Sequence, residues 1–232
     1  TNEKLARDEF TARELIKKAN VKTLCTTDDP IDSLEYHIGI KNDKVFDVEV
    51  RPTFRPDKGV RIDKEDYMSW LNKLEELHGK KIDSLAEFKK ALLKRIEFFH
   101  EVGCRISDHA LDPVVFEIGT EEEVDKIFKK KIFGEELTEK DVKIYKTNIL
   151  LFLGREYKRR GWVMQYHIGC IRNNSTRMYK KLGPDTGFDS IADETFVFAL
   201  SRILDTLDDT DELPKTILYN LNPRENETLG TL

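Results

Sequence analysis

The stretch WVMQYHIGCIRNNSTRMYKKLGPDTGFDSIAD, residues 162–193, decides the fold. It begins with an apolar run over residues 162–167 and breaks at Gly169 into a polar loop. A short apolar run followed by a loop rich in Arg, Asn, Asp and Gly predicts a buried strand that carries polar groups at its carboxyl end. In α/β proteins ligands bind at that end of the strands. The connection over residues 169–193 shows no helical period, and such long connections are typically functional. We therefore expect an active-site loop there.

Four further strands are predicted over residues 21–27, 46–54, 103–107 and 215–221. Helical patterns alternate with them, over residues 1–20, from Pro30 onward, and over 64–77, 84–102, 121–133, 138–160 and 194–207. Short buried strands that alternate with helices predict a parallel sheet with crossover helices, the α/β class. Each predicted strand ends in a polar cluster, as in the active site of a (β/α)₈ TIM barrel. We therefore expect one domain over 1–232 that holds about five of the eight β/α units of such a barrel.

Composition excludes several classes of partner. The formal net charge of −5 argues against a nucleic-acid backbone as the main partner. No apolar run approaches membrane-spanning length, and residues 1–20 show no signal-peptide pattern. The three cysteines are widely spaced, which predicts reduced, buried thiols and not a disulfide framework. We expect a cytoplasmic protein.

Two histidines and one carboxylate are the candidates for acid–base chemistry. His167 stands at a predicted strand end, where it could ligate a metal, orient a ligand or move a proton, or else be a hydrogen-bonded core residue. His109 follows Asp108 and is a second candidate acid or base, although an adjacent Asp also suits a helix cap. Asp28 could act as a general base, with its neighbour Asp29 capping a helix that starts at Pro30.

Two arginines are the candidates for binding an anion, because a guanidinium forms two parallel hydrogen bonds to a carboxylate. Arg55 follows the predicted strand over 46–54, and its structural alternative is a surface pair with Asp57. Arg172 lies in the loop over 169–193, and its alternative is a pair with Asp185.

Five motifs accompany these strand ends: LCTTDDP (24–30), TFRPD (53–57), SDHAL (107–111), QYHIG (165–169) and LGPDTGFD (182–189). In order and spacing they resemble the uronate isomerase family, also called glucuronate isomerase, and the resemblance covers nearly the whole chain. It implies a metal-dependent TIM barrel of the amidohydrolase superfamily. It also implies interconversion of D-glucuronate with D-fructuronate and of D-galacturonate with D-tagaturonate, with Arg55 contacting the substrate and His167 near the metal.

The sequence also departs from that family. The His-x-His pair that binds the divalent metal (such as zinc) in the family occurs nowhere in these 232 residues, so we expect the main ligands outside this chain and little or no metal on it. The chain resembles the central part of a uronate isomerase. The alternative is a non-catalytic sugar-acid-binding or assembly module. In either case we expect the outer strands of an open barrel to have unpaired edges, which favours aggregation, strand exchange or association of copies.

Overall fold

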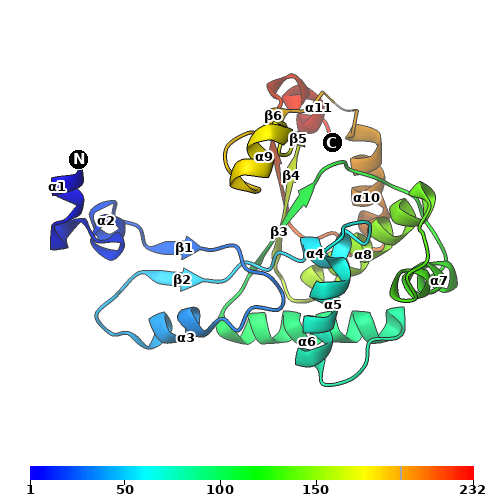
Figure 1. Cartoon of the computed structure of the whole chain (residues 1–232), viewed down its shortest axis with the longest axis horizontal. Helices are drawn as coiled ribbons and strands as arrows, with labels where there is room; N and C mark the ends of the chain where they lie inside the picture. The colour runs from blue at the N-terminus through cyan, green and yellow to red at the C-terminus, as the bar shows by residue number, and fades with distance from the viewer. Residues whose placement is uncertain (194) are drawn as a thin grey trace.

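Five parallel strands follow one another across the molecule in the computed structural model, which describes residues 1–193 and 195–232 (Figure 1). They are β1 (Thr23–Cys25), β2 (Glu49–Arg51), β3 (Ile106–Leu111), β4 (Val163–Ile168) and β7 (Thr216–Asn220). β1 pairs with β2, and β4 lies between β3 and β7. Phe54 joins the two groups, because it bridges Asp28 on one side and Ser107 on the other. The prediction of five parallel strands is therefore confirmed, and each strand neighbours the one before it.

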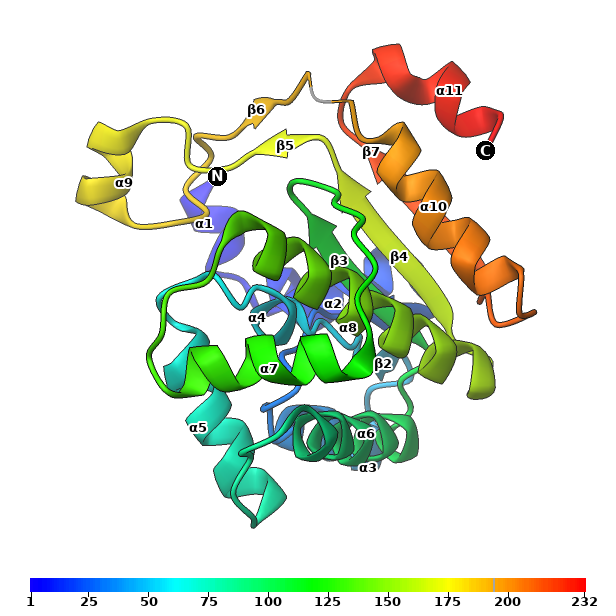
Figure 2. The ribbon, with the colours of Figure 1, turned by 90° about the vertical axis from the view of Figure 1, so that its right-hand side faces the viewer.

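The helices that connect these strands cover one face of the sheet (Figure 2). They are α3 (Glu35–Asn42), α4 (Asp57–Val60), α5 (Tyr67–His78), α6 (Leu85–Val102), α7 (Glu121–Ile132), α8 (Glu139–Arg159) and α10 (Val197–Asp208). Phe54 shows how the core is built. Its ring packs edge-on against that of Phe99 on α6, with centroids 5.1 Å apart, and its centroid lies 6.3 Å from that of Tyr157 on α8. On β4, Met164, Tyr166 and Ile168 face this core and are buried, whereas the side chains that alternate with them are half exposed.

Local capping residues fix several helix ends. The Thr138 side chain and Asp141 form a complete capping box at the start of α8. Gly161 follows the end of that helix at φ 65°, a conformation that favours glycine. Ser84 caps α6 by accepting from the Glu87 N–H, but the Glu87 carboxylate pairs with Lys90 and His78, so the reciprocal half of a capping box does not form.

The predicted helix over residues 1–20 is wrong. The segment forms α1 (Asn2–Leu5), a 3-10 turn over Asp8–Phe10, and α2 (Ala12–Lys18), which Thr11 caps. None of these residues is buried, and Figure 1 shows the segment at one end of the molecule. Because none of its side chains is buried, one long amphipathic helix would gain little over shorter turns.

The helix predicted to start at Pro30 is also misplaced, because α3 begins at Glu35 after Leu34 at φ 54°. Asp29 does not cap it. The Asp29 carboxylate accepts from the Ile31 N–H at 3.1 Å and from the Trp70 indole N–H at 2.7 Å, which fixes a turn before the helix.

Two predictions near the strand ends need correction. β3 runs to Leu111, so Asp108 and His109 lie inside the strand and not after it. The loop over 169–193 has structure of its own: β5 (Cys170–Ile171) pairs antiparallel with β6 (Ser190–Ile191), and α9 (Thr176–Leu182) lies between them.

Of the three cysteines, Cys104 and Cys170 are buried as predicted, but Cys25 on the edge strand β1 is exposed. Within the described residues, no helix combines the length and the apolar character that crossing a bilayer requires.

Candidate active site

Asp108 and His167 meet on the open face of the sheet. β3 and β4 are paired so that Ala110 lies opposite His167, and Asp108 shares that face because side chains alternate along a strand. His167 Nε2 lies 2.8 Å from Asp108 Oδ1. The Asp108 side chain is 6% exposed and that of His167 is 42% exposed, so the carboxylate lies beneath an imidazole that solvent can reach. The His167 ring also stacks on Tyr219 of β7, with centroids 4.6 Å apart.

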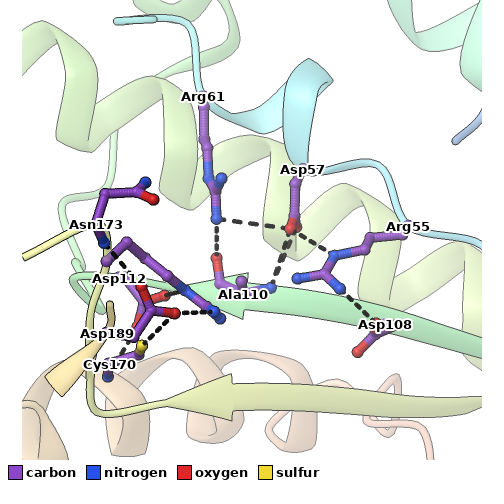
Figure 3. A network of polar contacts seen from close by, with 10 residues as sticks. Arg55, Asp57, Arg61, Asp108, Ala110, Asp112, Cys170, Asn173 and Asp189 are labelled. Atoms are coloured by element: carbon purple, nitrogen blue, oxygen red, sulfur yellow. Dashed lines mark hydrogen bonds and ion pairs between the residues drawn. The ribbon is translucent and has the colours of Figure 1, made fainter. Parts of the chain in front are cut away.

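Arg55 contacts the same carboxylate from the end of β2 (Figure 3). Its Nη1 donates to Asp108 Oδ2 at 3.1 Å, and its Nε donates to Asp57 Oδ2 at 2.9 Å. Burial lowers the pKa of this guanidinium, but the hydrogen bond to Asp57 and the charges of Asp57 and Asp108 outweigh that effect, and the net pKa is raised. Arg55 therefore stays a cation, and its side chain is still 31% exposed.

A second arginine, Arg61, belongs to this group although the sequence analysis missed it. Arg61 Nη2 lies 3.6 Å from Asp57 Oδ2 and donates to the Ala110 carbonyl at 3.1 Å. The available signal was the spacing of Asp57 and Arg61, four residues apart, with Asp57 opening the short helix α4 and Arg61 capping its end. The sequence indicates Asp108 and Asp57 only as neighbours of His109 and Arg55.

Arg172 lies on the loop that follows β4. Its Nη1 donates to Asp189 Oδ2 at 3.0 Å and its Nε to Asp112 Oδ2 at 3.4 Å, so the predicted alternative of a pair with Asp185 is wrong. The N–H of Asn173 and the Arg172 guanidinium lower the pKa of Asp189, which keeps this partner ionised. Arg172 and His167 both line an open cavity of about 870 Å³ beside β7, together with Tyr219 and Asn220.

The Asp28 carboxylate has a different set of partners, after the end of β1. Its Oδ2 accepts from the Thr26 hydroxyl at 2.6 Å and from the Thr53 N–H at 3.0 Å. His37 Nε2 contacts the same Thr26 hydroxyl at 2.7 Å and lies 3.7 Å from Asp28 Oδ1. The Asp28 carbonyl also accepts from the Arg55 N–H. Asp28 therefore ties the end of β2 to β1, and its carboxylate is occupied by local donors.

His109 faces the opposite side of β3 from Asp108. It is 1% exposed, its Nε2 lies 3.1 Å from the Tyr157 hydroxyl, and Tyr166 packs edge-on against its ring. Desolvation by burial lowers the pKa of His109 to about 4, so the imidazole is neutral at physiological pH. The structure therefore brings together His167, Asp108 and Arg55, and leaves His109 in the helix-facing core.

The open face offers few metal ligands. His167 and Asp108 provide one imidazole and one carboxylate at the same place, whereas a catalytic zinc site takes three protein ligands. Across residues 1–193 and 195–232, no group of three or more His, Cys, Asp and Glu side chains is arranged to hold a metal ion. The described residues therefore form at most part of a metal site.

Fold and site together define an α/β protein in which arginines, carboxylates and a histidine gather towards the carboxyl ends of the parallel strands. The chain belongs to the glucuronate isomerase family, whose sequence model matches residues 1–232. This finding confirms the resemblance inferred from the five motifs.

Individual relatives agree with this assignment. The chain is 52% identical over 231 residues to a protein named uronate isomerase from Caldanaerobacter subterraneus subsp. tengcongensis, covering 100% of this chain and 50% of that protein. It is 56% identical over 224 residues to the uronate isomerase of Caldicellulosiruptor bescii, covering 97% and 48% respectively. The chain therefore spans about half the length of the curated relatives it matches.

Solved structures show the same fold. The crystal structure of uronate isomerase from Thermotoga maritima superposes with a TM-score of 0.87 at 34% sequence identity, covering 94% of this chain and 48% of that one. That of glucuronate isomerase from Caulobacter crescentus superposes with a TM-score of 0.86 at 26% identity, covering 96% and 46%.

Proposed function

We propose that this chain forms the part of a uronate isomerase that binds the substrate carboxylate and moves protons during aldose–ketose isomerisation. The substrates would be D-glucuronate, converted to D-fructuronate, and D-galacturonate, converted to D-tagaturonate. The observation that carries this proposal is the single carboxylate of Asp108, which contacts both a half-exposed histidine and a half-exposed arginine. A proton-transfer group and an anion-binding group thus share one partner at the carboxyl ends of parallel strands.

Arg55 and Arg172 would bind the anionic substrate. A guanidinium matches a carboxylate through charge-assisted hydrogen bonds, and Arg55 has its Nη2 without a partner among the described residues. Arg172 lines the same cavity as His167, where it can contact a hydroxyl or a carboxylate.

His167 would move protons, with Asp108 setting its orientation. The isomerisation removes the C2 proton and protonates the carbonyl oxygen on C1, which gives an enediol. The O2 proton then leaves and C1 gains a proton, so the reaction is balanced without an external reductant. An imidazole beside a buried carboxylate can transfer protons between O1 and O2 in this sequence. That Asp28 is the general base stays a prediction, as does a catalytic role for His109; their surroundings support structural roles for both.

We propose that the complete fold is a (β/α)₈ barrel of the amidohydrolase type. The five strands are parallel and each is adjacent to its predecessor, which is the strand order of a barrel and not of a doubly wound sheet. His167 is the side chain best placed to join a divalent metal, with the remaining ligands supplied from outside these 232 residues.

A partial barrel predicts association. In the part of the chain that the structure describes, β1 and β7 each have a strand partner on one side only. We expect light scattering on the 232-residue chain to give a mass well above 27.1 kDa, through dimers or larger species. A monodisperse species of 27.1 kDa would contradict the open-barrel proposal.

The direct test is conversion of D-glucuronate to D-fructuronate, assayed with and without added zinc or manganese. The assay is run on the 232-residue chain and on the natural gene product, whose intact mass is measured in parallel. We expect turnover by a product that carries additional metal ligands and none by the 232-residue chain. Turnover by neither, together with binding of D-glucuronate, would favour the non-catalytic sugar-acid-binding module.

A further inference from the structure

Asp57 is the centre of the polar network at the end of β2, and none of the roles above uses it directly (Figure 3). Its carboxylate accepts from Arg55 Nε, lies 3.6 Å from Arg61 Nη2, and accepts from the Ala110 N–H at 3.2 and 3.3 Å. The side chain is 12% exposed. A carboxylate this buried is costly unless donors surround it, and here two guanidinium groups and one backbone amide do so.

The contact between Asp57 and Arg55 determines which nitrogen of the Arg55 guanidinium is left to bind a ligand. Nε is bound to Asp57 and Nη1 to Asp108, so the plane of the guanidinium is fixed at two points. Nη2 has no partner among residues 1–193 and 195–232. Without Asp57 the guanidinium would be held at Nη1 alone and could rotate about that contact. Nη2 would then no longer point in one defined direction.

The contact to Ala110 connects the same carboxylate to the proton-transfer side of the site. Ala110 lies on β3 two residues after Asp108, directly opposite His167 on β4. Arg61 reinforces this connection, since it donates to the Ala110 carbonyl while it pairs with Asp57. Asp57 therefore holds the start of α4 and the carboxyl end of β3 in one relative position.

We infer that Asp57 is a positioning residue of the active site: it aims Arg55 at the substrate carboxylate and sets the distance between Arg55 and the His167–Asp108 pair. This inference rests on the proposed function, and it assigns Asp57 no contact with the substrate. A purely structural role, in which Asp57 only stabilises the start of α4, is the competing explanation.

The test is Asp57→Asn, made in the natural gene product and assayed with D-glucuronate. The amide keeps the shape of the side chain but removes its charge, so Arg55 loses its strongest partner at Nε. We expect KM to rise by about tenfold to a hundredfold, with kcat changed by less than about threefold, because binding of the substrate carboxylate is weakened. A purely structural role would instead lower the unfolding temperature and leave the KM of the folded enzyme unchanged.

Asp125→Asn is the matched control. Asp125 also accepts from a backbone N–H, that of Leu85 at 2.8 Å, and also pairs with a cation, Lys129 at 2.7 Å, but it lies on α7 away from the site. We expect this variant to keep the wild-type KM and kcat while losing a similar amount of thermal stability.

A second measurement separates failure of this inference from failure of the proposed function. NMR of the arginine Nε–H groups reports how strongly Arg55 is held, whether or not the protein turns over a uronate. We expect solvent exchange of the Arg55 Nε–H to speed up by at least about tenfold in Asp57→Asn and to stay unchanged in Asp125→Asn. An unchanged exchange rate in Asp57→Asn, or a KM equal to that of the wild type in an active enzyme, would overturn the positioning role. Absence of turnover in the wild-type protein would count against the proposed function alone.

Discussion

Asp108 and His109 are neighbours in the sequence, and the two faces of β3 make them different chemical groups. Asp108 lies on the open face, beneath the half-exposed His167 and against Arg55. His109 lies on the helix-facing side, enclosed by Tyr157 and Tyr166 and 1% exposed. Both side chains are buried, but Asp108 contacts charged partners that solvent and ligands can reach, whereas the groups in contact with His109 are the uncharged rings of Tyr157 and Tyr166. Environment, and not residue type, therefore determines which neighbour can take part in chemistry.

Removing the charge on the open face should give the largest effect. Asp108→Asn eliminates the carboxylate that contacts both Arg55 and His167, so we expect the kcat/KM for D-glucuronate to fall by about 10²- to 10⁴-fold in the natural gene product. The control is Asp63→Asn, which removes a half-buried ion pair with Lys146 outside the site and should leave the kinetics unchanged. Equal losses of kcat/KM in the two variants would mean that the open face is no more important for the reaction than the rest of the molecule.

On the core face the expected effect is on stability and its dependence on pH. The pKa of His109 is about 4 in the folded protein and about 6.5 in the unfolded chain, so between these values only the unfolded chain binds the extra proton. The free energy of unfolding therefore falls as the pH drops from 6.5 towards 4, by about 3 kcal/mol from this group alone.

His109→Gln tests this assignment, because Gln cannot titrate but can still hydrogen-bond the Tyr157 hydroxyl. We expect urea unfolding of the variant to lose less stability than the wild type between pH 6.5 and pH 4. We also expect its kcat/KM to stay within about threefold of the wild type, since the side chain faces the helices. A large loss of activity at unchanged stability would mean that His109 takes part in the reaction, and the comparison of the two faces would fail.

The same comparison explains what the sequence could and could not predict. Strands and most helices follow from apolar period and caps, as at Thr138 with Asp141, because those signals are local. The roles of Asp108 and His109 depend on which face of β3 each one occupies, and a sequence pattern with both residues polar gives no preference. The extent of β3 to Leu111 is set by pairing with β4, a contact between segments more than 50 residues apart. The four-residue spacing of Asp57 and Arg61 suggests their pair, but it carries no information about their common partner Ala110, which lies on β3.

The smallest expected effect concerns the ring that supports His167. Tyr219 stacks on the imidazole with planes 10° apart, and its hydroxyl donates to Gln165 Oε1 at 2.9 Å. Tyr219→Leu removes both contacts, and Tyr219→Phe removes only the hydroxyl. Stacked aromatic pairs contribute about 0.5–1.5 kcal/mol beyond area burial, so we expect Tyr219→Leu to lower kcat/KM by about twofold to tenfold. If stacking is the important contact, the kcat/KM of Tyr219→Phe should stay close to that of the wild type. If Tyr219→Phe instead loses as much kcat/KM as Tyr219→Leu, the hydrogen bond to Gln165 is what orients His167. Tyr219 lies on the open face and is 43% exposed, so its replacement should change thermal stability less than His109→Gln does. The two variants thus separate a residue that orients His167 from one that supports the core.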